Sequence, residues 1–225
     1  MSFIDRAVPT PEQRRERNRE EMTTAILDAA RDIMREGGAG ALNLNQLARR
    51  VNVTTPALYS YFPSKFAIYD ALYQLGIQMV REQEEEIWRQ TRPDWDRLRR
   101  WFDARVRFVI EHPELYRLMF HNPVPGFTPS DDAASEARKQ LENARRGLKE
   151  VIAAGVIQPD IPVDRAVDLL LAIRHGIVAE RIGKANVVPA DSGRFEHLVE
   201  DAVAMLSLAW KPGIERQDGR DDAPG

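Results

Sequence analysis

Apolar residues recur at three- and four-residue steps along most of this chain, the spacing that places side chains on one face of an α-helix. Prolines, glycines and capping residues separate the periodic stretches. Helices are therefore expected at residues 11–36, 45–51, 56–62, 64–90, 95–111, 112–120, 130–154, 163–182 and 192–210. No stretch alternates apolar and polar residues as a strand does, so the predicted fold class is all-α with about nine helices.

Two very short helical patterns meet across a tight turn within residues 44–65. Asn43 is placed to cap the first pattern and Thr54 to cap the second. The second pattern, about two turns long, offers Leu58 and Phe62 as inward anchors. A helix this short is not stable alone, so its neighbours must hold it. Two tyrosines and several small hydroxyl residues would then face outward, as they do in a helix-turn-helix motif whose second helix enters the DNA major groove.

This stretch contains a motif that specifies the residue type at many positions. It reads Leu47-Ala48, Val53-Thr54, Leu58-Tyr59 and Tyr61-Phe62-Pro63-Ser64-Lys65. In these residues the chain resembles the N-terminal domain of TetR-type transcriptional regulators, over roughly residues 23–72. Three positions depart from that family: Asn52 replaces the usual Gly, Asn43 the usual Thr, and Phe66 a commonly acidic residue. The first two replacements are conformationally compatible, whereas the third leaves the predicted fold intact and affects the expectation of one polar contact.

The resemblance implies a three-helix DNA-binding domain followed by a larger helical domain for ligand binding and dimerisation. The protein would be a homodimer that binds a palindromic operator in double-stranded DNA and is released by a small-molecule effector. It would act as a repressor, as most of that family do. Two alternatives stay open: a constitutive DNA-binding dimer without an effector, and a helical adaptor or enzyme that has lost DNA binding.

The expected DNA contacts lie on and around the second short helix. They are Asn43, Asn45, Thr54, Thr55, Pro56, Ala57, Tyr59, Ser60, Tyr61 and Lys65. Thr54, Ser60 and Lys65 are expected to hold phosphates. The outward residues between them are expected to meet base edges, thymine methyl groups or the sugar-phosphate backbone.

The predicted domains follow from these assignments. Residues 1–20 are an N-terminal arm, partly disordered; residues 21–66 form the DNA-binding domain; residues 67–210 form the ligand-binding and dimerisation domain; residues 211–225 are a disordered tail. A connector helix at 64–90 joins the two domains. Two interpretations of the arginines at 14, 15, 17 and 19 stay open, an arm on the DNA backbone and a solvated helix start.

Composition narrows the class of protein. The 225 residues fit one or two compact units, and the absence of cysteine excludes disulfides, thiolate catalysis and cysteine metal sites. No apolar run has the length of a membrane span and no signal-peptide pattern is present, so we expect a cytoplasmic protein. The net charge is −3, yet residues 37–69 contain no Asp or Glu and three cations, Arg49, Arg50 and Lys65. Local positive charge suits phosphate contact; a solvated patch is the alternative.

The last two expected helices are the candidate dimer interface. Residues 163–182 are nearly apolar around the whole helix, which indicates burial on all sides. Two helices from each subunit would pack as a four-helix bundle, through Leu170, Ile173, Ile177, Phe195, Val199, Val203 and Leu206. The alternative is that these residues are the internal core of one subunit.

The candidate effector pocket combines aromatic and polar residues of the larger domain: Trp101, Arg105, Phe108, Tyr116, Met119, Phe120, Phe127 and His175. Ordinary helix core explains most of them equally well. The four histidines fit no metal signature, and no phosphate loop, nucleophile elbow or paired-carboxylate motif occurs. We therefore expect no cofactor, no metal site and no catalytic residue, and a protein that is not an enzyme.

Overall fold

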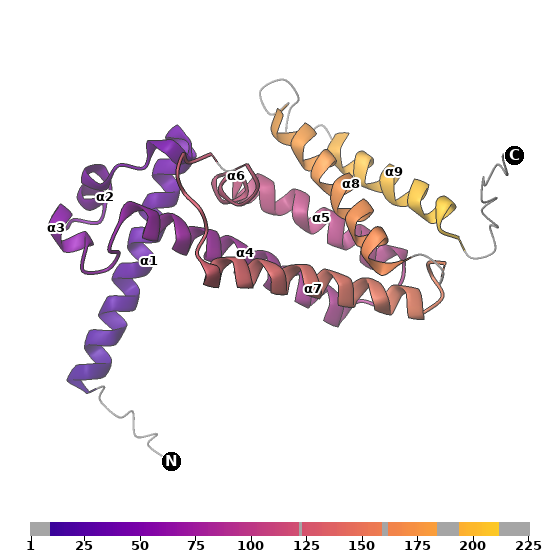
Figure 1. Ribbon diagram of the computed structural model, residues 1–225, viewed down its shortest axis with the longest axis horizontal. Helices are drawn as coiled ribbons and strands as arrows, with labels where there is room; N and C mark the ends of the chain where they lie inside the picture. Colours follow the sequence, from indigo (N-terminus) through magenta and orange to yellow (C-terminus); the bar gives the residue numbers. More distant parts are fainter. Residues whose placement is uncertain (1–9, 122, 159–161, 184–193, 212–225) are drawn as a thin grey trace, which may run out of the picture. The chain divides into compact units, whose positions relative to one another are not determined.

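The computed structural model of the chain describes residues 10–121, 123–158, 162–183 and 194–211. Over these ranges the chain is helical without strands (Figure 1), which confirms the predicted all-α class. The elements are α1 (Pro11–Gly37), the 3-10 turn η1 (Ala39–Ala41), α2 (Leu44–Arg50), α3 (Thr55–Leu58), α4 (Lys65–Gln90), α5 (Trp95–Glu111), α6 (Pro113–Phe120), α7 (Asp131–Ala153), α8 (Val163–Gly183) and α9 (Arg194–Ala209). The first nine residues of the predicted arm and the tail from 212 onward lie outside the described residues.

The chain divides into two compact units. Unit 1 consists of Met1–Gln78 and His112–Ala137, and unit 2 consists of Met79–Glu111 and Arg138–Gly225. Both α4 and α7 contribute residues to each unit. Unit 1 is therefore larger than the predicted 21–66 domain, since α6 and the first half of α4 belong to it.

The core of unit 1 gathers side chains from α1, α2, α3 and α4. Its buried members include Ile26, Ala30, Ile33, Met34, Leu47, Ala48, Leu58, Ile68, Tyr69 and Leu72. The Tyr69 hydroxyl donates a hydrogen bond to the carbonyl oxygen of Ala39 over 2.5 Å. Burial also raises the pKa of Tyr69 to about 12, because a phenolate would have to form away from water. Tyr69 thus ties α4 to the turn that follows α1.

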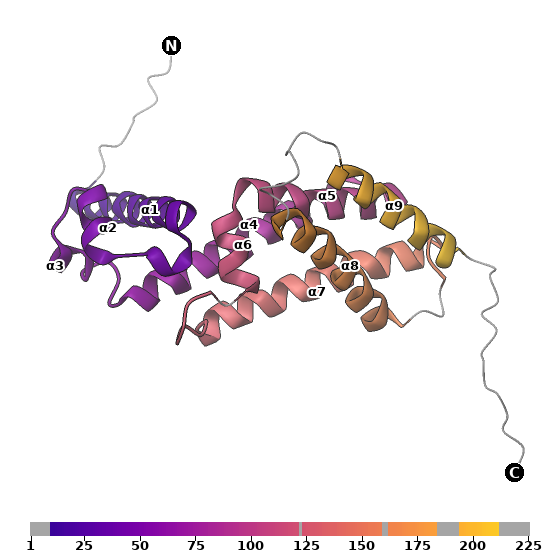
Figure 2. The ribbon, with the colours of Figure 1, turned by 90° about the horizontal axis from the view of Figure 1, so that it is seen from above.

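Unit 2 packs α5 against α8 and α9, and α8 against α9 (Figures 1 and 2). Its core holds two tryptophans, Trp88 and Trp101, whose ring centroids lie 5.9 Å apart. A Cβ atom at Gly147 would come within 2.5 Å of Trp88, so α7 carries a glycine where the indole lies against it. Buried Arg97 donates to the Trp88 carbonyl over 3.0 Å and to Glu150 over 2.7 Å, which fixes the end of α4. No helix in the described part of the chain is long and apolar enough to cross a membrane.

Candidate nucleic-acid interface

The turn between α2 and α3 is shaped by two asparagines. The Asn43 side chain caps α2, accepting hydrogen bonds from the amides of Asn45 (2.9 Å) and Gln46 (3.2 Å). Asn52 adopts φ 56°, the left-handed conformation that Gly and Asn tolerate best. The amide of Val53 then bonds back to the Ala48 carbonyl over 2.9 Å, which closes the turn. The two sequence departures from the family at these positions therefore keep the turn geometry.

The second helix is shorter than the predicted 56–62. Helix α3 covers only Thr55–Leu58, capped by the Thr54 hydroxyl, which accepts from the Ala57 amide over 3.3 Å. Beyond it the amides of Tyr59, Ser60 and Tyr61 bond to carbonyls three residues back, the tighter 3-10 pattern, so the α-helix ends early. The backbone still turns through Phe62, whose amide bonds to the Leu58 carbonyl over 2.9 Å.

Burial separates the anchors from the outward residues as predicted. Leu58 is 2% exposed and Phe62 8%, whereas Tyr59 is 51% exposed. Six of the ten predicted contact residues are exposed (Asn43, Asn45, Thr54, Pro56, Tyr59 and Ser60), and four are half-buried (Thr55, Ala57, Tyr61 and Lys65). None lies in the core, so this surface is available to a partner.

Three polar contacts organise the outward surface. The Thr55 hydroxyl donates to Asn45 Oδ1 over 2.8 Å, joining α3 to α2. The Arg19 guanidinium lies 5.5 Å from the centroid of the Tyr61 ring, and the Lys65 ammonium lies 5.6 Å from that of Tyr69.

The net positive charge of this region is smaller than the three cations of residues 37–69 alone would give. Arg50 donates to Glu36 over 2.5 Å, and this hydrogen bond lowers the pKa of Glu36 and raises that of Arg50. Glu36 stands one residue before the acid-free stretch and pairs with one of its three cations. Arg49 and Lys65 are the other two cations of this stretch.

A buried carboxylate that the sequence analysis missed ties α6 to α1 within unit 1. The fully buried side chain of Glu114 accepts from Arg31 Nε (3.0 Å) and from Arg35 Nη2 (3.0 Å) and Nε (3.2 Å). Arg31 Nη2 also lies 2.8 Å from His112 Nδ1. A glutamate inside the apolar run of α6 was the available signal, because buried acids are paired.

A second missed cluster lies in unit 2. Glu84, only 2% exposed, accepts from Arg105 (3.1 Å), Arg174 (3.1 Å) and Gln140 (2.9 Å), and the Arg174 guanidinium lies 3.9 Å from the Trp101 ring centroid. The sequence analysis proposed Trp101 and Arg105 for the effector pocket but not their partners. Glu84 was hidden in a run of charged residues, and its bond to Arg174 joins positions 90 residues apart.

The eight residues predicted for the effector pocket are divided between the units. Trp101, Arg105, Phe108 and His175 belong to unit 2, and Tyr116, Met119, Phe120 and Phe127 belong to unit 1. In unit 1, the last three of these line a pocket of about 180 Å³ together with Tyr73, Leu118, Thr128 and Pro129. Phe120 is 40% exposed.

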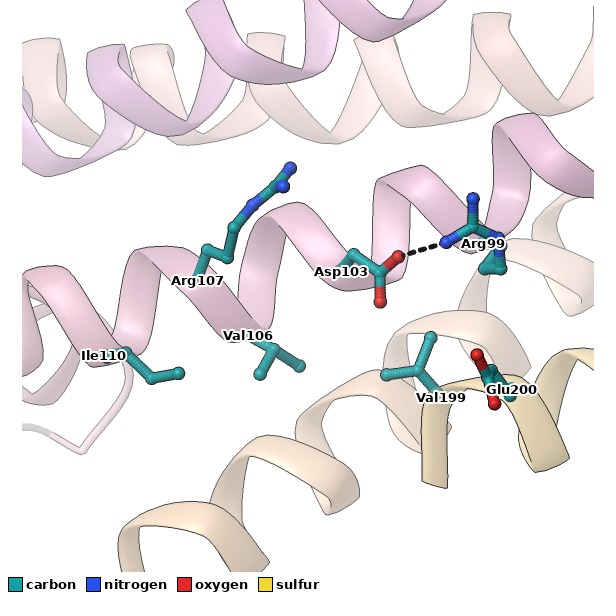
Figure 3. A pocket seen from close by; sticks show the side chains of 7 residues that line it. All are labelled: Arg99, Asp103, Val106, Arg107, Ile110, Val199 and Glu200. Carbon is teal, nitrogen blue, oxygen red and sulfur yellow. Dashed lines mark hydrogen bonds and ion pairs between the residues drawn. The ribbon is translucent and has the colours of Figure 1, made fainter. Parts of the chain in front are cut away.

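A larger pocket of about 330 Å³ opens between α5 and α9 in unit 2 (Figure 3). It is lined by Arg99, Asp103, Val106, Arg107, Ile110, Val199 and Glu200. Asp103 points toward Arg99, which donates to it over 2.8 Å. The sequence analysis predicted none of these residues as a ligand contact.

The predicted dimer residues mostly face inward. Leu170, Ile177, Val199, Val203 and Leu206 are at most 8% exposed within one chain, Ile173 is half-buried, and the Phe195 side chain lies outside the described residues. Among the described residues of these helices, the exposed large apolar side chains are Leu169 (43%), Met205 (64%) and Leu208 (69%). Those five residues are buried as the internal-core alternative expects, and the dimer interface itself stays a prediction.

Two family models match the chain. The model described as "Bacterial regulatory proteins, tetR family" matches residues 26–72, and that described as "Tetracyclin repressor-like, C-terminal domain" matches residues 98–205. The chain belongs to the TetR family. Helices α1 to α3 are thus the helix-turn-helix region of a TetR-family transcriptional regulator.

Similar proteins are consistent with this family. The "HTH-type transcriptional activator FasR" of Mycolicibacterium smegmatis is 30% identical over 104 residues, which span 46% of this chain and 48% of FasR. A solved structure of a protein with unknown function from Rhodococcus sp. RHA1 has a TM-score of 0.71 at 22% identity, covering 92% of this chain and 99% of that one. AibR, solved with isovaleryl coenzyme A and operator DNA, has a TM-score of 0.63 at 17% identity, covering 82% of this chain and 97% of AibR. The match to FasR spans about half the length of that relative.

Proposed function

We propose that this TetR-family protein binds a palindromic operator as a homodimer and that a small-molecule effector controls its affinity for DNA. The observation that carries the proposal is the arrangement of α3. Leu58 and Phe62 are buried, Tyr59 is 51% exposed, and no acidic residue occurs between 37 and 69. An exposed phenol can contact bases and sugars, and a surface without acidic residues does not repel phosphates.

The residues around α3 have distinct roles in the proposed complex. Lys65, Thr54 and Ser60 contact phosphates and set the position of the helix on the duplex. Tyr59 and Thr55 meet base edges, and Asn45 holds Thr55 in place through their 2.8 Å hydrogen bond. The two copies of α3 in a dimer lie in successive major grooves, on the order of 34–36 Å apart.

The proposed dimer forms through the exposed apolar positions of α8 and α9. Leu169 on α8 and Met205 and Leu208 on α9 are the exposed large apolar side chains of these two helices among the residues described. Two helices from each chain would cover these side chains in a four-helix interface.

The effector is proposed to present hydrogen-bond acceptors to unit 2. Among the described residues, the buried indole N–H groups of Trp88 and Trp101 and the side-chain amide nitrogen of Asn143 have no acceptor. Buried donors without acceptors are costly, and a carbonyl or carboxylate oxygen would satisfy them. Acyl-CoA thioesters are the first class to test, since AibR is solved with one of them.

The effector acts by binding one spacing of the two α3 helices more tightly than another. Helix α4 begins in unit 1 and ends in unit 2, so it is the element through which this difference would reach the DNA-binding region. Repression is the proposed sense of regulation, because most of the family represses.

A gel shift on the protein's own upstream DNA across a series of salt concentrations tests the proposal. A protein with several phosphate contacts loses affinity steeply as salt rises. We expect Tyr59→Ala with Lys65→Ala to abolish the shift while helicity and dimer mass stay unchanged. The control Lys149→Ala removes an exposed lysine of α7 that is not among the predicted DNA contacts and should keep the shift.

The outcomes separate the competing functions. Binding that no acyl-CoA thioester changes, together with no thermal shift across a wider ligand screen, indicates a constitutive DNA-binding dimer. Absence of any salt-sensitive binding indicates an adaptor that lost DNA binding. A reporter gene downstream of the bound DNA gives the sign of regulation.

A further inference from the structure

Helix α1 extends far beyond the part that packs in unit 1. It has 27 residues, its buried residues begin at Ile26, and residues 11–21 are all exposed. The matched family region also begins at residue 26. Figure 1 shows this first half of α1 projecting past α2 and α3. At about 1.5 Å per residue, the eleven exposed residues add roughly 16 Å of helix.

The extension has its own start signal. The Thr10 hydroxyl accepts from the Gln13 amide over 3.2 Å, and Gln13 Oε1 accepts from the Thr10 amide over 2.8 Å. This capping box satisfies amides that would otherwise lack partners, and Pro11 fits the first turn. Residues 11–21 are therefore built as a helix, in agreement with the helix predicted at 11–36.

Two arginines continue the buried stripe of α1 into this extension. Arg19 and Arg15 stand seven and eleven residues before Ile26, so each lies within about 20° of Ile26 around the helix. The contact between Arg19 and Tyr61, 5.5 Å to the ring centroid, places this face beside the residues that follow α3. Arg15 is one turn farther out on the same face.

The remaining charges of the extension lie on other faces. Arg17 is on the side opposite Ile26 and pairs with Glu21 over 3.4 Å, both of them exposed. Glu16 and Glu20 are about 80° and 120° away from Ile26. Glu12 shares the face of Arg15 but only in the first turn. Two of the four arginines, Arg15 and Arg19, thus lie on the face that points toward α3, whereas most of the glutamates lie on other faces.

We infer that residues 11–21 of α1 form a second DNA-contacting surface, in which Arg15 and Arg19 bind phosphates of the duplex that flanks the base pairs contacted by α3. This inference rests on the proposed DNA binding. Guanidinium groups pair with phosphate oxygens through two parallel hydrogen bonds, without reading sequence. A helix of roughly 16 Å can follow about five base pairs of flanking DNA at 3.4 Å per base pair.

Fluorescence anisotropy with the full chain and its upstream DNA tests this surface. We expect Arg15→Ala with Arg19→Ala to weaken binding on the order of tenfold for specific and random duplexes alike. The slope of log K against log salt should fall by about two, one for each lost phosphate contact. The control Arg14→Ala with Arg17→Ala removes the same charge from other faces and should keep the slope.

DNA length gives a second, independent measurement. Shortening the flanks of the bound site by about five base pairs on each side should weaken the wild type and leave the Arg15→Ala, Arg19→Ala variant unchanged. Arg15→Ala alone, which keeps the contact between Arg19 and Tyr61, should lower the slope by about one.

Two results would overturn the inference while the proposed function stands: a wild-type slope in the Arg15, Arg19 variant, or an equal loss in the control. A wild type that binds no upstream DNA at any salt concentration overturns the proposed function itself, and this inference with it.

Discussion

Thr55 donates a hydrogen bond from its hydroxyl to the side-chain oxygen of Asn45 over 2.8 Å, and this bond joins the first turns of α3 and α2. Both residues precede the buried anchors of their helices, Leu58 and Leu47. The bond therefore fixes the angle at which α3 leaves the turn, at positions proposed to meet DNA.

Replacing Thr55 with Val keeps the shape of the side chain and removes the donor. We expect a loss of about 0.5–1 kcal/mol in unfolding free energy, because the bond is exposed and a partner amide stays solvated. Operator affinity should fall more than stability does. Urea unfolding and anisotropy measure the two effects, and Thr24→Val, an exposed threonine of α1, is the matched control. Equal loss of affinity in both variants would contradict this role.

Removing the Glu114 carboxylate should destabilise unit 1. Its side chain is fully buried between the guanidiniums of Arg31 and Arg35, so Glu114→Ala leaves those charges without it. Breaking a buried pair in this way costs about 3–5 kcal/mol, and we expect the lower part of that range because Arg35 is 44% exposed. Denaturant unfolding checks this, with the exposed Glu142→Ala as control. A loss below that of Glu142→Ala would show that the ion pairs contribute nothing net.

Two glycine-to-alanine changes should have opposite signs. At Gly147 the new Cβ would meet the Trp88 ring at 2.5 Å, so Gly147→Ala should destabilise unit 2 by about 1–3 kcal/mol. At Gly183 no atom lies within 4 Å of that position, so Gly183→Ala should be neutral or stabilise the helix by up to about 1 kcal/mol. Thermal unfolding of both variants measures the difference, and a Gly147→Ala protein as stable as the wild type would refute the packing at Trp88.

The proposed dimer surface predicts a change in mass. Leu208→Glu places a charge on the most exposed large apolar side chain of α9 and should convert the dimer to a monomer. Light scattering after size exclusion measures this. Ile110→Glu, which changes an apolar residue of α5 that is 46% exposed, should remain dimeric. A dimeric Leu208→Glu protein would move the interface elsewhere.

Alkaline stability should depend on Tyr69. Its folded pKa of about 12 lies above its ordinary value of 10, so folding favours the neutral phenol. The stabilisation is complete below pH 10 and is lost as the pH rises from 10 through 12. In the Tyr69→Phe variant the unfolding free energy should therefore fall less steeply over that pH window. At pH 7 this variant should be less stable by about 1 kcal/mol, because it lacks the hydrogen bond to the Ala39 carbonyl. Parallel curves for the two proteins would contradict the raised pKa.

Local signals predicted most of the helices. The bounds of α5, Trp95–Glu111, agree with the prediction because Pro93 and Pro113 interrupt the helical pattern on either side. The bounds of α3 differ from the prediction. After Leu58 the backbone changes to i→i−3 hydrogen bonds, and this change leaves the spacing of the apolar residues unaltered.

Other features depend on pairs that periodicity does not encode. Glu84 and Arg174 meet across 90 residues, and no local pattern indicates which distant cation a buried acid will find. The burial of the α8 residues within one chain could not be predicted, for a related reason. Leu169, Leu170 and Leu171 follow one another on α8, so apolarity alone could not indicate that Leu170 faces the core and Leu169 the solvent.

Asn52 has a consequence for the order of the unbound protein. Asn52 has φ 56° in the folded protein. A glycine at this position could adopt the same conformation, but it would sample more backbone conformations in the unfolded chain. Asparagine has fewer such states than glycine in the unfolded chain, so forming the turn before α3 costs less backbone conformational entropy. A turn that already has its final conformation in the unbound protein lowers the entropy cost of binding a DNA duplex.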